Sequence, residues 1–261
     1  MARIIAVANQ KGGVGKTTTS INIAASLAIG GSRTLLVDID PQSNATSGVG
    51  IQANELPSSI YQCLIHGFSA HQTIVQSNID NLSILPATAD LAGAEVELVQ
   101  VASREMALKR VLDPIANDYA YVLLDCPPAF GLLTINAMAC ASSVLIPMQC
   151  EYYAMEGLGR LMASIERVKS TLNPTIELEG IVLTMFDSRN SLSRQVADEV
   201  RTHFGEKVFK SVVPRNVTLA EAPSYGRPAV LYNSSSSGAQ AYLDLAKELM
   251  HHGKEGAGQR A

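Results

Sequence analysis

A glycine-rich segment between an apolar run and a helical pattern most constrains the fold of this chain. Residues 11–18 read KGGVGKTT and follow the apolar run of residues 3–8. Glycines in such a segment let the backbone curl so that successive N–H groups point at an anion, and the dipole of the following helix strengthens that cradle. The ammonium of Lys16 suits the β- and γ-phosphates, and the hydroxyl of Thr17 suits Mg²⁺. The segment therefore predicts a phosphate-binding loop between a strand and a helix.

Short apolar runs alternate with longer helical patterns along the rest of the chain. Buried strands are predicted at residues 3–8, 34–38, 82–85, 121–125, 144–148 and 180–184. Helices are predicted at residues 16–29, 91–112, 134–141, 155–172, 192–204 and 240–250. This alternation predicts an α/β fold with a single doubly wound, mostly parallel sheet flanked by helices. Sites in such folds lie at the carboxyl ends of the strands.

One domain is expected over residues 1–250, because no internal repeat or long linker divides the chain. Its length allows a large buried core. The remaining residues, 251–261, read HHGKEGAGQRA and have no apolar face. A segment of this composition predicts a disordered tail.

Composition narrows the class of protein further. The chain has 261 residues, of which 47% are hydrophobic and 17% charged, so a disordered or fibrous protein is excluded. The net charge of −4 argues against a surface built entirely for nucleic acid, although it leaves room for a local basic patch. Four cysteines without CxxC spacing predict reduced thiols. No secretory signal is visible, and no apolar stretch approaches the roughly 18 residues of a membrane span. We therefore expect a cytoplasmic protein without a membrane partner.

Three aspartates follow or end predicted strands. Asp38 and Asp40 leave the second strand on the same side of the chain, because side chains alternate along a strand. Near a phosphate loop, two such carboxylates can organise a metal ion and orient an attacking water. Asp125 ends the apolar run YVLLD and resembles a Walker B aspartate, which holds Mg²⁺ through a water. Together with the loop, these residues predict nucleotide hydrolysis.

Two further patterns bear on the nucleotide. Residues 184–187 read TMFD, with methionine where the guanine-binding pattern [NT]KxD has lysine, so ATP is favoured over GTP. Residues 48–53 read GVGIQA and match a dinucleotide fingerprint by spacing. They follow a polar turn rather than a strand, so we expect no dinucleotide site there.

Four segments together resemble the ParA/Soj family of partition ATPases. They are NQKGGVGKTT at residues 9–18, LLVDIDPQSNATSGVG at 35–50, LLDCPP at 123–128 and VVPRNVTLAEAPSYGRP at 212–228. The resemblance extends to about Met250. In this family the loop is a deviant Walker A motif, in which glutamine is ordinary at the position of Gln10.

The resemblance implies ATP and Mg²⁺ as cofactors and assigns a role to each matching residue. Lys11 would reach across a dimer to the partner's phosphates, and Gly12 would lie at the close contact between subunits. Thr18 would bond the α-phosphate. The complete set of nucleotide-binding loop residues would be Lys11, Gly12, Gly13, Val14, Gly15, Lys16, Thr17 and Thr18. Lys11, Lys16 and Asp40 form the predicted catalytic set.

The resemblance also places residues outside the loop. Asp40 would position the hydrolytic water, and Asp38 would support the metal shell. Asp125 would be the Walker B carboxylate, so the expected metal site consists of Thr17, Asp38 and Asp125. Pro214 and Asn216 would contact the adenine.

The family's cycle implies three partners. ATP would close a sandwich homodimer, the dimer would bind double-stranded DNA without sequence preference, and a ParB-like protein would stimulate hydrolysis through its N-terminal segment. Residues 181–231 hold seven basic and five acidic side chains, a local balance of +2. Arg189 and Arg215 are the predicted DNA contacts, so we expect association with the nucleoid. Relatives often carry arginine at four positions that differ here, which predicts weaker DNA binding: Thr218, Leu231, Ser235 and Ser237.

Three alternatives use related chemistry. A nucleotide-dependent regulator of replication initiation or transcription would use the same change of state, so the sequence leaves this alternative open. A MinD-type membrane ATPase would end in a basic amphipathic helix, whereas residues 251–261 lack apolar residues. A relative of the nitrogenase iron protein would need two cysteines in glycine-rich loops, and Cys63, Cys140 and Cys150 lie in other contexts. The choice between a chromosomal and a plasmid system also stays open.

Overall fold

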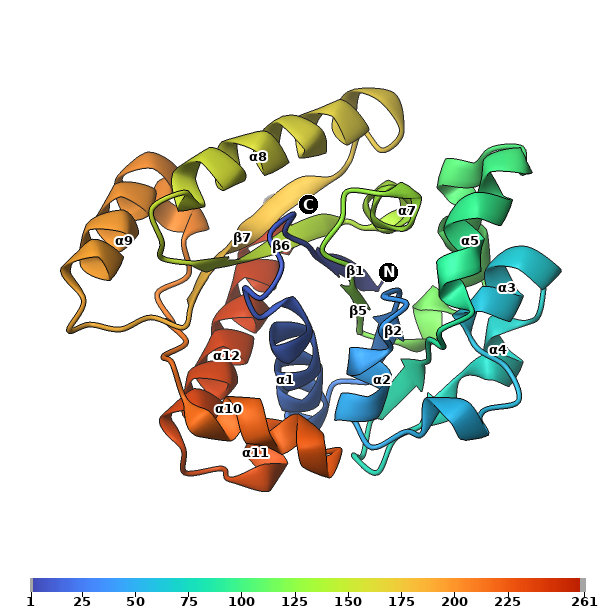
Figure 1. Ribbon diagram of the computed structural model, residues 1–261, viewed down its shortest axis with the longest axis horizontal. Helices are drawn as coiled ribbons and strands as arrows, with labels where there is room; N and C mark the ends of the chain where they lie inside the picture. Colours follow the sequence, from blue (N-terminus) through green and yellow to red (C-terminus); the bar gives the residue numbers. More distant parts are fainter. Residues whose placement is uncertain (1, 259–261) are drawn as a thin grey trace.

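A seven-stranded sheet lies between two layers of helices in the computed structural model, which describes residues 2–258 and their side chains as far as residue 251 (Figure 1). The strands are β1 (Arg3–Val7), β2 (Thr34–Asp38), β3 (Val75–Gln76), β4 (Leu82–Leu85), β5 (Tyr121–Asp125), β6 (Ser143–Gln149) and β7 (Glu177–Thr184). Their order is β3-β4-β2-β5-β1-β6-β7. All neighbouring strands are parallel except the pair of β3 and β4, so the predicted fold class is confirmed.

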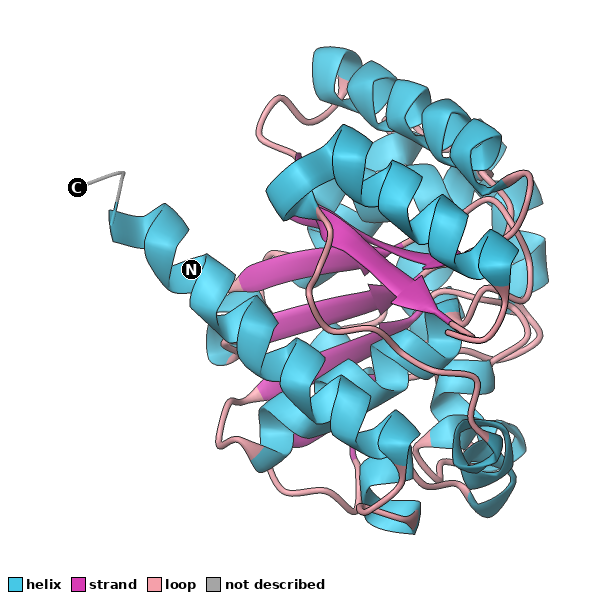
Figure 2. Ribbon diagram, turned by 90° about the vertical axis from the view of Figure 1, so that its left-hand side faces the viewer, coloured by secondary structure: helices cyan, strands magenta, loops and turns pink. Residues whose placement is uncertain are grey.

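Helices connect the strands and cover both faces of the sheet (Figures 1 and 2). They are α1 (Lys16–Ile29), α2 (Asn44–Gly48), α3 (Ile60–His66), α4 (Ala70–Thr73), α5 (Leu91–Glu97), α6 (Ala107–Leu112), α7 (Leu132–Cys140), α8 (Ala154–Thr171), α9 (Ser191–Phe204), α10 (Val217–Glu221), α11 (Ala229–Tyr232) and α12 (Ser237–Gly258). None of the helices in the described part of the chain is long and apolar enough to cross a membrane.

The two faces of the sheet carry separate apolar clusters. Along β1, Ile5 and Val7 point into the cluster that α1 and α12 complete, while Ala6 points into the cluster formed with α5 to α9. All three side chains are completely buried. Strands covered on both faces are apolar at nearly every position, which explains why the sequence shows continuous apolar runs instead of alternation.

The long helix predicted at residues 91–112 is wrong as a single element. Helix α5 ends at Glu97, two short 3₁₀ turns follow, and α6 begins only at Ala107. Ser103 adopts a positive φ of 51°, which a regular helix excludes. The side chain of Asn136 on α7 accepts from the Leu108 N–H at 3.0 Å and donates to the Arg104 carbonyl at 2.9 Å. A contact from a distant helix thus helps to fix the turn, and local apolar spacing cannot show it.

Helix α12 begins and ends beyond the range predicted for it. It runs from Ser237 to Gly258, so the backbone is helical over most of the segment predicted as a disordered tail (Figure 2). Each residue added to an existing helix gains a backbone hydrogen bond, so a polar segment can continue a helix that packing has started. Residues 259–261 of the predicted tail lie outside the described residues.

Candidate nucleotide site

The carboxyl ends of three neighbouring strands bring the predicted site residues together. Strand β5 lies between β1 and β2, with Asp125 opposite both Val7 and Asp38 in the two registers. The glycine-rich loop leaves β1 at this edge and leads into α1 (Figure 1). The chain therefore places the loop and the predicted aspartates at one edge of the sheet, as expected for a doubly wound fold.

The loop needs glycine at two positions for backbone reasons. Gly13 has a φ of 74° and Gly15 a φ of 85°, a conformation that side chains rarely tolerate. Gly12 is different, because a Cβ added there would meet only the Cβ of Pro128, at an ordinary 4.0 Å. The described chain itself therefore gives no reason for glycine at position 12.

Lys16 is held inside this loop. Its side chain is nearly buried, and its Nζ donates to the carbonyl of Lys11 at 3.0 Å. Burial lowers the pKa of the ammonium, while the negative charges of Asp125 and Asp40 oppose that shift. The lysine therefore lies among the carboxylates at the start of α1, as a phosphate-binding lysine should.

Asp125 presents one paired and one unpaired oxygen. Its Oδ1 accepts from the hydroxyl of Ser20 at 2.8 Å, whereas its buried Oδ2 has no hydrogen-bond partner among the described residues. Burial, followed by the charge of Asp38, raises the pKa of Asp125 to about 8, and the hydroxyls of Ser20 and Thr17 oppose this shift. A buried carboxylate oxygen without a partner, beside a threonine hydroxyl, fits a divalent cation.

The donor set also indicates which cation fits. No group of three His, Cys, Asp or Glu side chains in the described part of the chain could hold a metal by itself. Mg²⁺ suits such a place, because it keeps several waters and takes further oxygens from nucleotide phosphates. The residues present therefore fit Mg²⁺ bound together with a nucleotide.

Asp38 and Asp40 have different surroundings. Asp38 is completely buried, and burial raises its pKa to about 6. Its Oδ1 accepts from the Asp40 N–H at 3.1 Å, and its Oδ2 accepts from the N–H and the hydroxyl of Thr46, both at 2.8 Å. Asp40 accepts from the Gln42 N–H through Oδ1 at 2.9 Å. Asp38 therefore holds the segment that carries Asp40. Its predicted support of the metal shell stays a prediction, because both of its oxygens accept hydrogen bonds from Asp40 and Thr46.

Lys11 points away from its own loop. Its Nζ forms an ion pair with Glu151, which follows β6, and about half of the lysine side chain is exposed. Its backbone N–H donates to Oδ1 of Asn9 at 3.0 Å. The two lysines of the motif thus differ: Lys16 is buried in the loop and Lys11 reaches outward.

Of the two predicted adenine contacts, Pro214 lies in a segment that is joined to the loop through the end of β7. The end of β7 is joined to the loop, since the Thr184 hydroxyl donates to the Val14 carbonyl at 2.8 Å. Pro214 pairs with Phe186 just beyond β7. Asn216 donates to the Ser237 hydroxyl at 3.0 Å, but its buried Oδ1 has no partner among the residues described. An unpaired buried acceptor can be satisfied by an amino group such as that of adenine.

Comparison with known proteins identifies the family. A model of the AAA domain family matches residues 2–178. The sporulation initiation inhibitor protein Soj of Bacillus subtilis (strain 168) is 52% identical over 97% of this chain and 100% of its own length. The chromosome partitioning protein ParA of Myxococcus xanthus (strain DK1622) is 53% identical over 96% of this chain and 88% of its own. The chain belongs to the ParA/Soj family of P-loop ATPases.

A solved structure agrees with this assignment. Cobyrinic acid a,c-diamide synthase from Mycobacterium smegmatis, with bound ADP and magnesium, is 38% identical to this ParA/Soj chain. It aligns with a TM-score of 0.86 over 98% of this chain and 97% of its own. The likeness therefore covers the whole ParA/Soj fold rather than the loop alone.

The two arginines predicted to contact DNA lie around one aspartate. Arg189 donates to both oxygens of Asp187, at 3.0 and 2.9 Å, and holds the pKa of Asp187 at about 2. The charge of Arg215 contributes to the same shift. Both arginines are exposed, yet the ion pair with Asp187 offsets one of the two positive charges. The net positive charge around Asp187 is therefore smaller than two exposed arginines would give.

Sequence reasoning missed three partners of the site in this ParA/Soj chain. Ser20 orients Asp125, Thr46 holds Asp38, and Glu151 pairs with Lys11. Ser20 lies one helical turn after Lys16, so the spacing on α1 provided a usable signal. The other two contacts depend on how the chain folds back, and no local pattern marks them.

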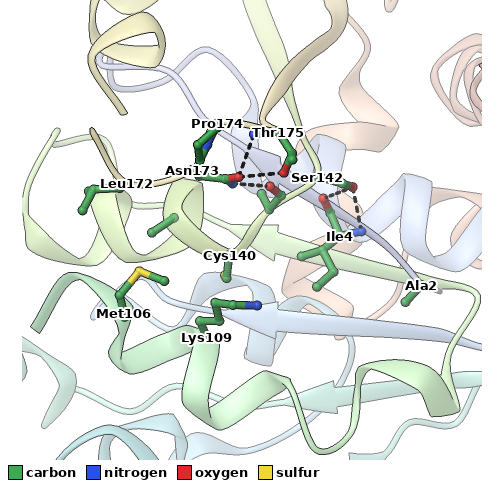
Figure 3. Close-up of a pocket in the computed structure, with 12 residues that line it drawn as sticks. Ala2, Ile4, Met106, Lys109, Cys140, Ser142, Leu172, Asn173, Pro174 and Thr175 are labelled. Atoms are coloured by element: carbon green, nitrogen blue, oxygen red, sulfur yellow. Dashed lines mark hydrogen bonds between the residues drawn. The ribbon is translucent and has the colours of Figure 1, made fainter. Parts of the chain in front are cut away.

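A surface cavity of about 270 Å³ lies at the amino ends of the strands, opposite the end that carries the nucleotide site (Figure 3). It is lined by residues at the amino ends of β1 and β6, including Ile4 and Ser142. Its amide and hydroxyl groups bond within the chain: Asn173 donates to two backbone carbonyls, and Ser142 donates to Ile4. The cavity is therefore separate from the nucleotide site.

Proposed function

We infer that this chain acts in DNA partitioning as an ATP-driven switch between monomer and dimer. Its ParA/Soj relatives support the partitioning role, and ATP and Mg²⁺ are the cofactors of such an ATPase. The arrangement of the two lysines carries the proposal for the switch. Lys16 occupies the loop of its own subunit, while Lys11 extends outward to Glu151 and is half exposed. A lysine in that position is available to a nucleotide bound by a second copy.

Each site residue has a defined task in this proposal. The loop N–H groups, Lys16 and Thr18 bind the phosphates, and Thr17 and Asp125 hold Mg²⁺. Mg²⁺ neutralises phosphate charge and orients the transferring group when bound. Asp40, held by Asp38, positions the attacking water. Pro214 and Asn216 face the adenine, whose amino group would satisfy the unpaired oxygen of Asn216.

Dimerisation completes the site. Lys11 donated by the partner neutralises charge that develops on the phosphoryl group, so hydrolysis depends on two subunits meeting. Gly12 fits this proposal, because nothing in the described chain excludes a side chain there, whereas a close approach of a partner would. The dimer then binds double-stranded DNA on the nucleoid without sequence preference, through Arg189 and Arg215. The N-terminal segment of a ParB-like protein stimulates hydrolysis and returns the chain to the monomer.

Molar mass measured by light scattering tests the switch. With Mg²⁺ and ATP, an Asp40→Ala variant should form a stable dimer, because it binds nucleotide but does not position water. Wild-type protein should dimerise and revert as ATP is consumed. Lys11→Ala should stay monomeric throughout, both before and after ATP is consumed. If wild type and Asp40→Ala both remain monomeric at saturating ATP, the role of Lys11 across the dimer is wrong.

A second candidate function is nucleotide-dependent regulation of replication initiation or transcription. The name of the Bacillus subtilis relative, sporulation initiation inhibitor protein Soj, favours it. In cells, the trapped Asp40→Ala dimer should then change the timing of initiation or the transcript levels without DNA loss. A partitioning protein should instead produce cells lacking DNA.

A further inference from the structure

Hydrolysis requires that Asp40 be held at one place, although it lies on a loop after β2. Two bonds shape this loop internally. The Ser43 N–H donates to the Asp40 carbonyl at 2.9 Å, and the Gln42 N–H donates to Oδ1 of Asp40 at 2.9 Å. Such turn bonds fix Asp40 relative to its own loop. They do not attach the loop to the sheet.

The Ile39 N–H attaches the chain to the Asp125 carbonyl at 3.1 Å, and Asp38 provides the side-chain attachment. It ends β2, is completely buried, and lies opposite Asp125 in the register of β2 and β5. Its Oδ1 accepts from the Asp40 N–H at 3.1 Å. The Asp38 carboxylate therefore helps to set the direction in which the backbone leaves the sheet at Asp40.

Thr46 in turn fixes the Asp38 carboxylate. Oδ2 of Asp38 accepts two bonds, both from Thr46 and both 2.8 Å long: one from its N–H and one from its hydroxyl. The same hydroxyl accepts from the Ala87 N–H, beyond β4, at 3.0 Å. Thr46 and Ala87 are completely buried. Since the hydroxyl donates one bond and accepts another, its orientation is fixed, and it joins α2 to two strand ends.

We propose that Thr46 is a positioning residue for ATP hydrolysis, because it fixes the Asp38 carboxylate that holds the backbone of Asp40. The proposal rests on the proposed function, from which the role of Asp40 comes. Removing the hydroxyl leaves the buried Ala87 N–H without its partner and Asp38 without one of its three bonds. Only the N–H groups of Thr46 and Asp40 then hold the Asp38 carboxylate, so it can shift and the Asp40 backbone shifts with it. Because Asp40 acts on the water rather than on the phosphates, the effect falls on kcat and leaves KM unchanged.

Steady-state hydrolysis by three variants tests this inference. Thr46→Val keeps the shape and removes the hydroxyl, so kcat should fall about 10- to 100-fold, as expected when a reacting group is displaced by about an ångström. KM for ATP and the ATP-dependent molar mass should match wild type. Thr46→Ser restores the hydroxyl and should recover most of kcat. Thr46→Cys, with its weakly donating thiol, should lie between these two variants.

Thr73→Val is the matched control. Thr73 is also a buried threonine, and its hydroxyl donates to the Ser69 carbonyl at 3.1 Å, away from the nucleotide site. It should lose stability comparably and keep the wild-type kcat. The inference is overturned if Thr46→Val hydrolyses ATP as fast as Thr73→Val, if KM rises in step with the fall in kcat, or if Thr46→Ser fails to recover activity. Should circular dichroism show that Thr46→Val does not fold, a wild-type kcat for Thr46→Cys would equally overturn it.

The same data separate this inference from the proposed function. If wild-type protein hydrolyses ATP but never dimerises, the monomer–dimer switch is wrong. The ratio of kcat between wild type and Thr46→Val then still decides the role of Thr46.

Discussion

Asp38 and Asp125 are two buried carboxyl groups on neighbouring strands, and their burial has consequences for pH. An aspartate in an unfolded chain titrates near pH 4. In the fold, burial raises the pKa of Asp38 to about 6 and that of Asp125 to about 8. Between about pH 4 and about pH 8, the folded protein therefore binds more protons than the unfolded chain. The free energy of unfolding should therefore fall as pH rises, which is the reverse of the usual effect of a salt-bridged aspartate.

This sign can be checked by urea unfolding of the nucleotide-free protein. From about pH 6 to about pH 8, the wild type should lose free energy of unfolding relative to an Asp125→Asn variant, because only the wild type carries the titrating carboxyl at position 125. Ionic strength must be constant across the series. A difference between the two proteins that is independent of pH, or that grows in favour of wild type, would contradict the raised pKa.

At the level of elements, two turns that are distant in sequence touch through glycine. Gly50 follows α2, and Gly226 precedes α11. A Cβ on Gly226 would lie 2.8 Å from the Cα of Gly50, and a Cβ on Gly50 would lie 2.9 Å from the Gly226 carbonyl oxygen. The pattern GVGIQA that resembles a dinucleotide fingerprint therefore contains a glycine needed for packing.

Gly226→Ala should destabilise the protein by more than an ordinary left-handed glycine replacement. Gly67→Ala is the control, because Gly67 has a similar φ of 70° and open space around its Cβ position. That variant should lose only about 1 kcal/mol of unfolding free energy, from backbone strain. Gly226→Ala adds the clash with the Gly50 backbone, so its midpoint in urea should be clearly lower than that of Gly67→Ala. Equal midpoints would show that the two turns can separate at little cost.

At the level of the whole molecule, the proposed binding to DNA would have to overcome a net charge of −4. A dimer doubles the number of basic side chains that face DNA, so the ATP-bound form should bind duplex DNA at low salt and the ADP-bound form should not. In mobility shifts, Arg215→Ala should weaken the binding of the dimer to every sequence. The slope of the logarithm of the binding constant against the logarithm of salt concentration should also become shallower, by about 0.9 for each DNA phosphate that the arginine no longer neutralises.

Arg160→Ala provides the control for this prediction. Arg160 is an exposed arginine on α8 whose guanidinium pairs with Glu156, so the variant removes the same charge from a different element. Its DNA affinity should equal that of wild type. If both variants weaken binding equally, the affinity for DNA depends on the total charge of the protein and not on the surface around Arg215.

The local parts of the fold were readable from the sequence. The bounds of α1, β2, β4 and β5 match the predicted ranges, because buried parallel strands and a phosphate loop leave continuous local patterns. The short edge strand β3 was missed, since two residues carry too little pattern. The helix predicted over residues 91–112 failed where Asn136, on another helix, fixes a turn.

The sequence alone predicts the chemistry of the site, because the loop, Lys16 and the aspartates are short motifs whose function depends on residue type and local spacing. It could not show that Asp38 turns both oxygens to Thr46 and to the Asp40 backbone, or that Lys11 pairs with Glu151. Those contacts join residues that only the packing of helices on the sheet brings within hydrogen-bonding distance. Tertiary structure therefore decided which groups are buried, which pKa values shift, and which of the two lysines extends outward.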